Sequence, residues 1–175
     1  NHLGDPEILK TMVAEGAKNG ATHLKIQGLY YDELNFREQF EEQRSIEHQA
    51  SIVRPFEAEV ARLKPLTLSL ETETEFVQEC KAFGVIPMIT VFTHSGLDRA
   101  VKAGFRSFKI ASYDCSSIAL ISRILPVCDE LVISTGATSW DEIARTANFV
   151  AANKLDTTRI VFLHAVTEYP TEITS

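Results

Sequence analysis

Cysteine is scarce in this sequence, and its spacing fits neither a metal site nor a disulfide framework. The 175 residues contain three cysteines, Cys80, Cys115 and Cys128. An odd number without ligand spacing favours reduced thiols, which are typical of cytosolic proteins. We expect Cys80 and Cys128 to lie in the core and the protein to be cytoplasmic.

Several other features are absent. The net charge of −7 and the pI near 5.2 leave no basic excess for nucleic acid or an anionic membrane surface. No signal peptide and no apolar run long enough to span a bilayer is evident. Neither a G-x-G-x-x-G nor a Walker motif occurs, and no serine lies in a G-x-S-x-G elbow. His94 and His164 have no Cys, Asp or Glu at ligand spacing, so we assign no metal ligand to this chain.

Five short segments are rich in apolar and β-branched residues. They are nearly all apolar rather than alternating, which is typical of parallel strands covered on both faces. The predicted strands are Thr22–Gly28, Val85–Phe92, Ser107–Ser112, Leu131–Thr135 and Ile160–Ala165.

Amphipathic segments with helix-start signals fill the gaps between these strands. Asp5 is a predicted N-cap, followed by Pro6 at the first helical position. Thr72 and Ser139 each have a glutamate three residues later, which predicts two capping boxes. Shorter helices are expected at Leu97–Ala103 and Ile118–Leu125.

One segment breaks this alternation. Tyr30–Lys64 is polar and charge-rich, and its part Asn35–His48 has a helical pattern. We interpret it either as a solvated helix or as a long loop that forms a wall or lid over a site.

Strand–helix units at this spacing predict an α/β fold, either a doubly wound sheet or a (β/α)₈ barrel. Polar groups follow many successive strands, which favours the barrel, because an open sheet concentrates its site at one switch point. A barrel needs about 250 residues. We therefore expect a partial TIM barrel, roughly strands 2 to 6, in a single incomplete domain over residues 1–175, with exposed strand edges that favour association or aggregation. The polar groups are Gln27, Thr93–His94, Ser112, Ser134–Gly136 and Thr167–Tyr169.

Two lysines lie inside apolar strand segments, Lys25 in His-Leu-Lys-Ile-Gln and Lys109 in Phe-Lys-Ile-Ala-Ser. A buried ammonium costs several kcal/mol unless an anion or hydrogen bonds meet it. Together with Ser112 and the turn that begins at Ser134, the pair predicts a pocket for a small, multiply charged anion. The alternative is that each lysine extends from a strand end into water.

A covalent role for a lysine is a second alternative. Schiff-base aldolases need a desolvated amine, and two ammonium groups that share a pocket lower each other's pKa. A third alternative is a non-catalytic protein that binds a sugar phosphate or a similar small anion. The hydroxyls of Thr90, Ser112 and Ser134 favour anion binding.

Seven short motifs, in order along nearly the whole chain, resemble the sialic acid synthase family. This family includes the synthases of legionaminic acid, pseudaminic acid and spore-coat sugars. The motifs are Asn1-His2-x-Gly4-Asp5; Gly20-Ala21 with Lys25-x-Gln27; Leu68-Ser69; Thr90-x-Phe92; Lys109-Ile110-Ala111-Ser112; Ile133-Ser134-Thr135-Gly136; and Leu163-His164 with Tyr169-Pro170-Thr171.

The resemblance implies an enzyme that condenses phosphoenolpyruvate with an N-acyl amino sugar to give a nonulosonic acid and phosphate. It implies a TIM-barrel catalytic domain, a small antifreeze-like domain and a homodimer. Catalytic roles fall on Lys25, Lys109 and Tyr169, and substrate-binding roles on Asn1, His2, Gln27, Thr90, Ser112, Ser134 and Thr167.

The resemblance also implies a divalent metal, manganese or magnesium, whose ligands lie on strands outside this chain. We expect the 175 residues alone to be inactive for that reason. Three positions depart from the family pattern. Leu3 replaces a polar residue, Thr167 replaces an asparagine, and Ala137 replaces a methionine after Gly136.

Overall fold

The computed structural model describes residues 2–42, 53–168 and 170–172. Five strands form one parallel sheet in the order β1-β2-β3-β4-β5. All five predicted strands are confirmed, with boundaries that differ by at most two residues. The strands are β1 (His23–Gln27), β2 (Ile86–Thr90), β3 (Ser107–Ile110), β4 (Glu130–Ser134) and β5 (Arg159–Leu163).

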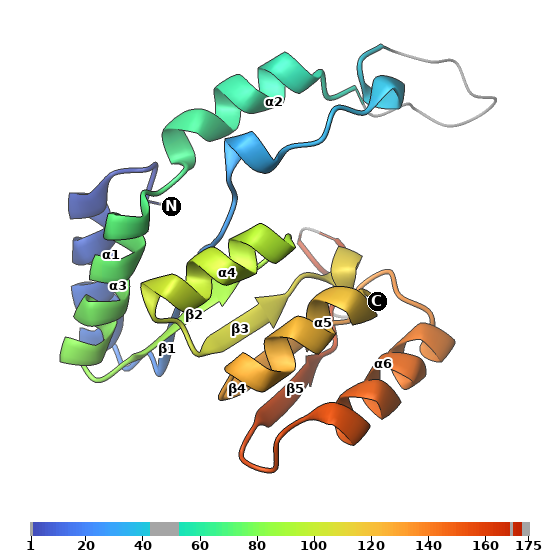
Figure 1. The fold of residues 1–175 in the computed structure, drawn as a ribbon. Coiled ribbons are helices and arrows are strands. Elements are labelled where there is room, and N and C mark those ends of the chain that lie inside the picture. The colour runs from blue at the N-terminus through green and yellow to red at the C-terminus, as the bar shows by residue number, and fades with distance from the viewer. Residues whose placement is uncertain (1, 43–52, 169, 173–175) are drawn as a thin grey trace.

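All the helices except α2 (Phe56–Leu63) cover one side of this sheet (Figure 1). They pack in chain order, α1 on α3, α3 on α4, α4 on α5 and α5 on α6. A doubly wound sheet has helices on both faces, whereas a barrel has them only outside. The partial (β/α)₈ barrel is therefore confirmed. The helices are α1 (Pro6–Lys18), α2 (Phe56–Leu63), α3 (Leu70–Ala82), α4 (His94–Ala103), α5 (Ile118–Ile124) and α6 (Trp140–Asn153).

Two of the three predicted helix caps are correct. The Asp5 carboxylate accepts hydrogen bonds from two N–H groups in the first turn of α1. Ser139 and Glu142 form the expected capping box of α6. The box at Thr72 is wrong, because α3 begins three residues earlier, where the Ser69 hydroxyl accepts a 3.0 Å hydrogen bond from the Thr72 N–H. Ser69 precedes Leu70, a partly buried residue that packs against the core.

The helix predicted over Asn35–His48 is wrong where it can be compared. Residues 35–42 contain one turn of 3-10 helix, Glu38–Phe40, and the remainder of that prediction lies outside the described residues. The longer segment Tyr30–Lys64 contains instead a helix that was not predicted, α2 (Phe56–Leu63), which begins after Pro55. Phe36 packs edge-on against Phe56 of α2, with ring centroids 6.0 Å apart. This aromatic contact joins the stretch around Phe36, which is not helical, to the start of α2.

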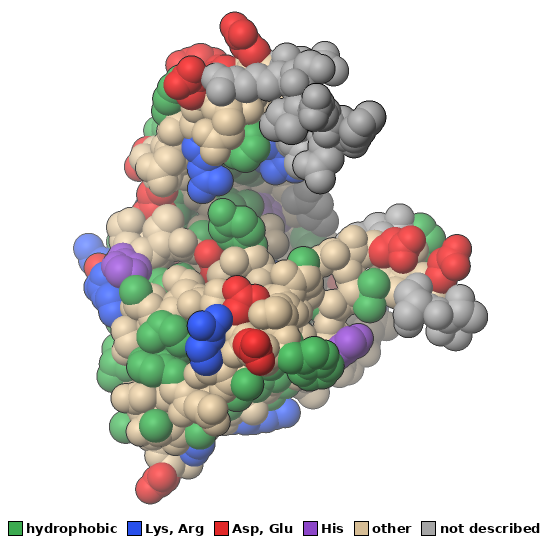
Figure 2. All heavy atoms as spheres, turned by 90° about the vertical axis from the view of Figure 1, so that its right-hand side faces the viewer, with side chains coloured by type: hydrophobic (Ala, Val, Ile, Leu, Met, Phe, Trp, Pro, Cys, Tyr) green, Lys and Arg blue, Asp and Glu red, His purple; other side chains and the backbone are tan. Residues whose placement is uncertain are grey.

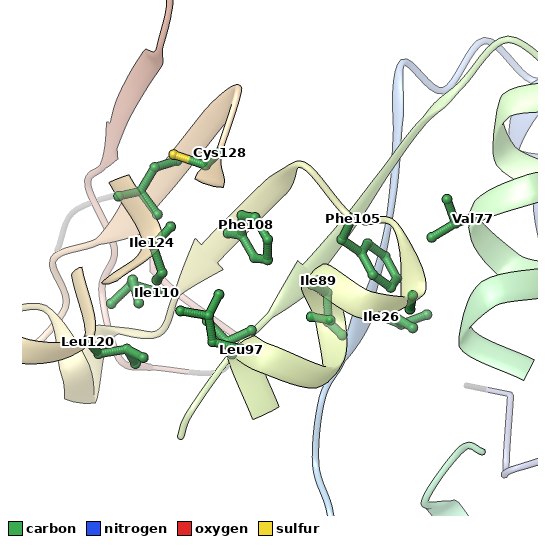
Figure 3. Packing of buried hydrophobic residues seen from close by; sticks show 14 of the residues in the cluster. Ile26, Val77, Ile89, Leu97, Phe105, Phe108, Ile110, Leu120, Ile124 and Cys128 are labelled. Atoms are coloured by element: carbon green, nitrogen blue, oxygen red, sulfur yellow. The ribbon is translucent and has the colours of Figure 1, made fainter. Parts of the chain in front are cut away.

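The main core lies between the sheet and the helices (Figure 3). Alternate strand residues such as Ile89, Phe108 and Ile110 are fully buried and point toward the helix layer. Phe105 stacks on Phe76 of α3 with ring centroids 6.0 Å apart. Full burial of each such side chain stabilises the fold by about 1.5–3 kcal/mol. The three cysteines are buried as well, as expected for Cys80 and Cys128.

A polar cluster occupies the other face of the sheet at the amino ends of the strands. The Glu130 carboxylate contacts His23 Nε2 at 2.8 Å, accepts a 2.8 Å hydrogen bond from the Ser107 hydroxyl, and pairs with Arg159 Nη1 at 3.0 Å. Each of the four residues is the first of its strand. Sequence reasoning missed this cluster, because Glu130 precedes an apolar run and its partners come from three other strands. In barrels, the amino end of the strands contributes to stability rather than to catalysis.

Candidate functional site

The two lysines lie on the face of the sheet opposite the helices, near the carboxyl ends of their strands. Lys25 alternates with the buried Ile26, and Lys109 with Phe108. Thr90 of β2 separates them, because it is the register partner of Lys109 and accepts a 3.2 Å hydrogen bond from Lys25 Nζ. The order of the strands therefore brings the two cations to one small region around a hydroxyl.

The premise that both ammonium groups are buried is wrong in this structure. Lys25 is exposed and Lys109 is half-buried, because their apolar sequence neighbours point toward the helices instead. Desolvation by the surrounding protein still lowers the pKa of both lysines from the ordinary value, and the Lys109 ammonium lowers the pKa of Lys25 further. An anion between the two lysines would relieve this repulsion and favour the charged form of both.

Hydroxyl groups of the next two units adjoin the lysines. Ser134 is buried and lies on the lysine face of β4. The Ser112 Oγ accepts a 3.1 Å hydrogen bond from the Gly136 N–H. A Cβ atom on Gly136 would lie 3.0 Å from that oxygen and 2.9 Å from the Thr167 methyl carbon, so only glycine lets these three segments meet.

The other predicted site residues are only partly placed. Gln27 is exposed on the same face as Lys25 and is the register partner of Thr90. His2 lies in the turn before α1, where its Nδ1 accepts a 3.0 Å hydrogen bond from the Gly4 N–H. Because α1 runs antiparallel to β1, this turn lies at the carboxyl end of the sheet. Asn1 and Tyr169 lie outside the described residues.

Sequence reasoning did not find a hollow of about 360 Å³ between the segment after β1 and the ends of β2 and β3. Aromatic Phe92 and Tyr113, the cations Arg37 and Arg54, and Asp114 line it. Burial raises the pKa of Asp114. Figure 2 shows that the part of the chain that contains α2 projects above the body of the protein. Acidic, basic and apolar side chains are interspersed on this face. Neither Lys25 nor Lys109 is among the residues that line this hollow.

The described ranges 2–42, 53–168 and 170–172 contain neither a metal-binding cluster nor a membrane-spanning helix. No cluster of three or more His, Cys, Asp or Glu in them is arranged to hold a metal ion. No helix in them is long and apolar enough to cross a membrane.

Comparison with known proteins gives this site its context. The profile of the NeuB family matches residues 12–175. The chain belongs to the NeuB family. It is 24% identical over 170 residues to the N,N'-diacetyllegionaminic acid synthase of Campylobacter jejuni, covering 97% of this chain and 50% of that protein. It is 26% identical to the synthase of the same name from Legionella pneumophila, with 97% and 47% covered. The NeuB-family chain thus spans about half the length of the curated relatives it matches.

Solved structures show the same fold. The N-acetylneuraminic acid synthetase of Leptospira borgpetersenii, in complex with citrate, superposes with a TM-score of 0.76 at 22% identity, covering 99% of this NeuB-family chain and 54% of the other. A putative spore coat polysaccharide biosynthesis protein E from Chromobacterium violaceum gives the same TM-score and identity, covering 99% and 49%. The DAHP synthase of Thermotoga maritima superposes with a TM-score of 0.60 at 10% identity, covering 95% and 40%. The resemblance found in the sequence is confirmed at the level of family and fold.

Proposed function

We propose that this chain supplies the phosphoenolpyruvate-binding part of a synthase that makes a nonulosonic acid from an N-acyl amino sugar. The observation that carries the proposal is the placement of Lys25 and Lys109 on either side of Thr90 at the carboxyl end of a NeuB-family barrel. The relatives named as legionaminic acid synthases support the sugar-acid product.

In this reaction the site must stabilise the charges of the bound anion and of the transition state. Lys25 and Lys109 bind the phosphate and carboxylate of phosphoenolpyruvate, and the hydroxyls of Thr90, Ser112 and Ser134 donate to the same oxygens. A carbon–carbon bond forms between the methylene carbon of the enol and the sugar aldehyde carbon, and the aldehyde oxygen takes the electron pair of the broken π bond and a proton to become a hydroxyl. Water then adds to the adjacent cationic carbon and loses a proton, and the carbon–oxygen bond to phosphate breaks as a ketone forms and phosphate leaves. The anion, held by two fixed cations, stays in place while positive charge develops next to it.

A divalent manganese or magnesium ion would polarise the sugar aldehyde in the proposed reaction. No cluster of His, Cys, Asp or Glu among the described residues fits such an ion. We propose that its ligands lie on strands outside this chain. A cytoplasmic homodimer closed by an antifreeze-like domain likewise remains a proposal.

Phosphate release by the complete gene product tests the function. The assay contains phosphoenolpyruvate, manganese and a panel of N-acyl amino sugars, with Lys25→Ala as the inactive control. We expect release that depends on one sugar, on the metal and on Lys25. Phosphoenolpyruvate binding without release for any sugar would favour a non-catalytic binding protein.

The lowered lysine pKa values favour one second candidate, a Schiff-base aldolase, since such an enzyme needs a free amine. Incubation with pyruvate and borohydride distinguishes the two. We expect no stable adduct on Lys25 or Lys109 by peptide mass spectrometry. A reduced pyruvyl adduct on either lysine would overturn the phosphoenolpyruvate proposal.

As pH rises, the affinity for phosphoenolpyruvate should begin to decrease at a lower pH than it would if both lysines had the ordinary pKa. The pKa of both lysines is lowered from 10.5 in the ligand-free protein, so the binding-competent charged form is lost as pH rises toward that value. Above about pH 7.5 the charge of the ligand is constant, because its phosphate titrates near pH 6. Calorimetric titration between pH 7.5 and 10.5 measures the effect. An affinity that is constant up to pH 10.5 would contradict it.

A further inference from the structure

A carboxylate that is almost completely enclosed lies in the helix layer behind the lysine site. Glu73 of α3 is 1% exposed. Its Oε1 accepts a 2.8 Å hydrogen bond from the Tyr30 hydroxyl, and its Oε2 accepts a 2.9 Å hydrogen bond from Arg99 Nε. Burial raises the pKa of Glu73, while these two donors lower it. Such a pair is weak evidence for stability, because apolar residues of equal volume often stabilise a core as well or better.

The same three residues join the first two strand–helix units. Arg99 belongs to α4, which follows β2, and its Nη2 donates a 2.7 Å hydrogen bond to the Leu68 carbonyl. Its guanidinium carbon lies 4.5 Å from the centroid of the Tyr30 ring. Tyr30 follows β1 and is itself buried. The network therefore determines where the chain leaves β1 relative to α3 and α4.

Gly28 connects this network to the site. Its N–H donates a 2.9 Å hydrogen bond to the carbonyl of Thr90, the residue whose hydroxyl accepts from Lys25. A Cβ atom on Gly28 would lie 3.1 Å from the Tyr30 hydroxyl and 3.3 Å from that carbonyl. The Tyr30 hydroxyl thus packs against the backbone that pairs the ends of β1 and β2. A shift of Tyr30 would change the separation of Lys25 and Thr90.

We infer that Glu73 is a positioning residue, which acts through Tyr30 and Gly28 to hold Lys25 and Thr90 in the geometry that binds the anion. The inference rests on the proposed function and assigns to it a residue that touches no substrate. Neither the family motifs nor the pattern of the sequence indicated Glu73, because its partners lie 43 and 26 residues away along the chain.

Calorimetric titration of the complete gene product with phosphoenolpyruvate, without sugar, tests the inference. In Glu73→Gln the side chain keeps its shape but loses its negative charge, so the charge-assisted hydrogen bond from Arg99 is weakened and the Tyr30 hydroxyl must accept from the amide group instead of donating to a carboxylate. We expect affinity to decrease about tenfold. Tyr30→Phe removes only the hydroxyl and should decrease affinity about threefold. The double variant should be no weaker than Glu73→Gln, because both changes break one link.

Val77→Ala is the matched control, since it removes buried volume from the same helix without touching the network. We expect it to lower the melting temperature and leave the affinity for phosphoenolpyruvate unchanged. Wild-type affinity in Glu73→Gln and Tyr30→Phe, with normal binding by the parent, would overturn the inference alone. A parent protein that does not bind phosphoenolpyruvate would overturn the proposed function and this inference together. If Glu73→Gln fails to fold, Tyr30→Phe still decides.

Discussion

Replacing Lys109 with methionine is expected to weaken phosphoenolpyruvate binding about 100-fold and to abolish phosphate release. Methionine keeps the length of the side chain but removes the ammonium group, which leaves a multiply charged anion with one cation in place of two. The loss of one charge-assisted partner in a partly desolvated site costs about 2–5 kcal/mol, and 1.4 kcal/mol corresponds to a tenfold change. Calorimetric titration at pH 7.5 gives the affinity, and the phosphate assay gives the turnover.

Lys102→Met is the matched control, because Lys102 is an exposed lysine in the last turn of the neighbouring helix α4. It should bind and turn over phosphoenolpyruvate as the parent protein does.

The Lys109→Met and Lys102→Met variants should also differ in stability. The lowered pKa of Lys109 means that its charge disfavours the folded state at neutral pH, a penalty that lessens as pH rises toward 10.5. Lys109→Met should therefore unfold at a higher urea concentration than Lys102→Met. Equal phosphoenolpyruvate affinity in the two variants would refute the role given to Lys109.

Truncation of Phe108 is expected to cost the largest amount of stability, about 3–5 kcal/mol in the free energy of unfolding for Phe108→Ala. This side chain is fully buried between β3 and the helix layer, so its removal leaves a cavity that the surrounding strands and helices cannot fill (Figure 3). Phe108→Leu should cost about 1–1.5 kcal/mol, since most of the volume is kept. Urea unfolding followed by circular dichroism measures both.

Phe83→Ala provides the comparison for this core substitution. Phe83 is 49% exposed at the end of α3, so its truncation should cost less than about 1 kcal/mol. A Phe108→Ala variant as stable as Phe83→Ala would contradict the position of the core. Because Phe108 precedes Lys109 on β3, we also expect the more destabilised variant to bind phosphoenolpyruvate less tightly near its unfolding midpoint.

The elements of the fold were accessible from local pattern. Strands such as β2 and β4 are short apolar runs that polar residues follow. A run of this kind is typical of a strand that is buried on both faces, so it can be found in the sequence alone. The caps at Asp5 and Ser139 depend on groups within four residues, so local chemistry predicts them. The prediction of a cap at Thr72 for α3 was wrong, because it too relied on local chemistry alone. Both Ser69 and Thr72 are residues that can cap a helix, and the local pattern does not choose between them.

The candidate site was predicted in part. The family motifs identified Lys25, Lys109 and Ser112, and the parallel order of the strands does place these residues at one end of the sheet. The environment of the lysines was predicted wrongly, since an apolar sequence neighbour lies on the opposite face of a strand and says little about burial of the residue itself. The crowding at Gly136, where Ser112 and Thr167 meet, requires the register of β3, β4 and β5.

The sequence by itself determined the family and the parallel strand–helix alternation, and it proposed the two cations of the candidate site, because each of these depends on short motifs or on local periodicity. Only the tertiary structure decided which distant residues meet around the two buried carboxylates. Glu73 meets Tyr30 and Arg99, and Glu130 meets His23 and Arg159, across separations of 26 to 107 residues. A buried carboxylate needs partners from whichever segments the fold brings near, and no local pattern specifies those segments.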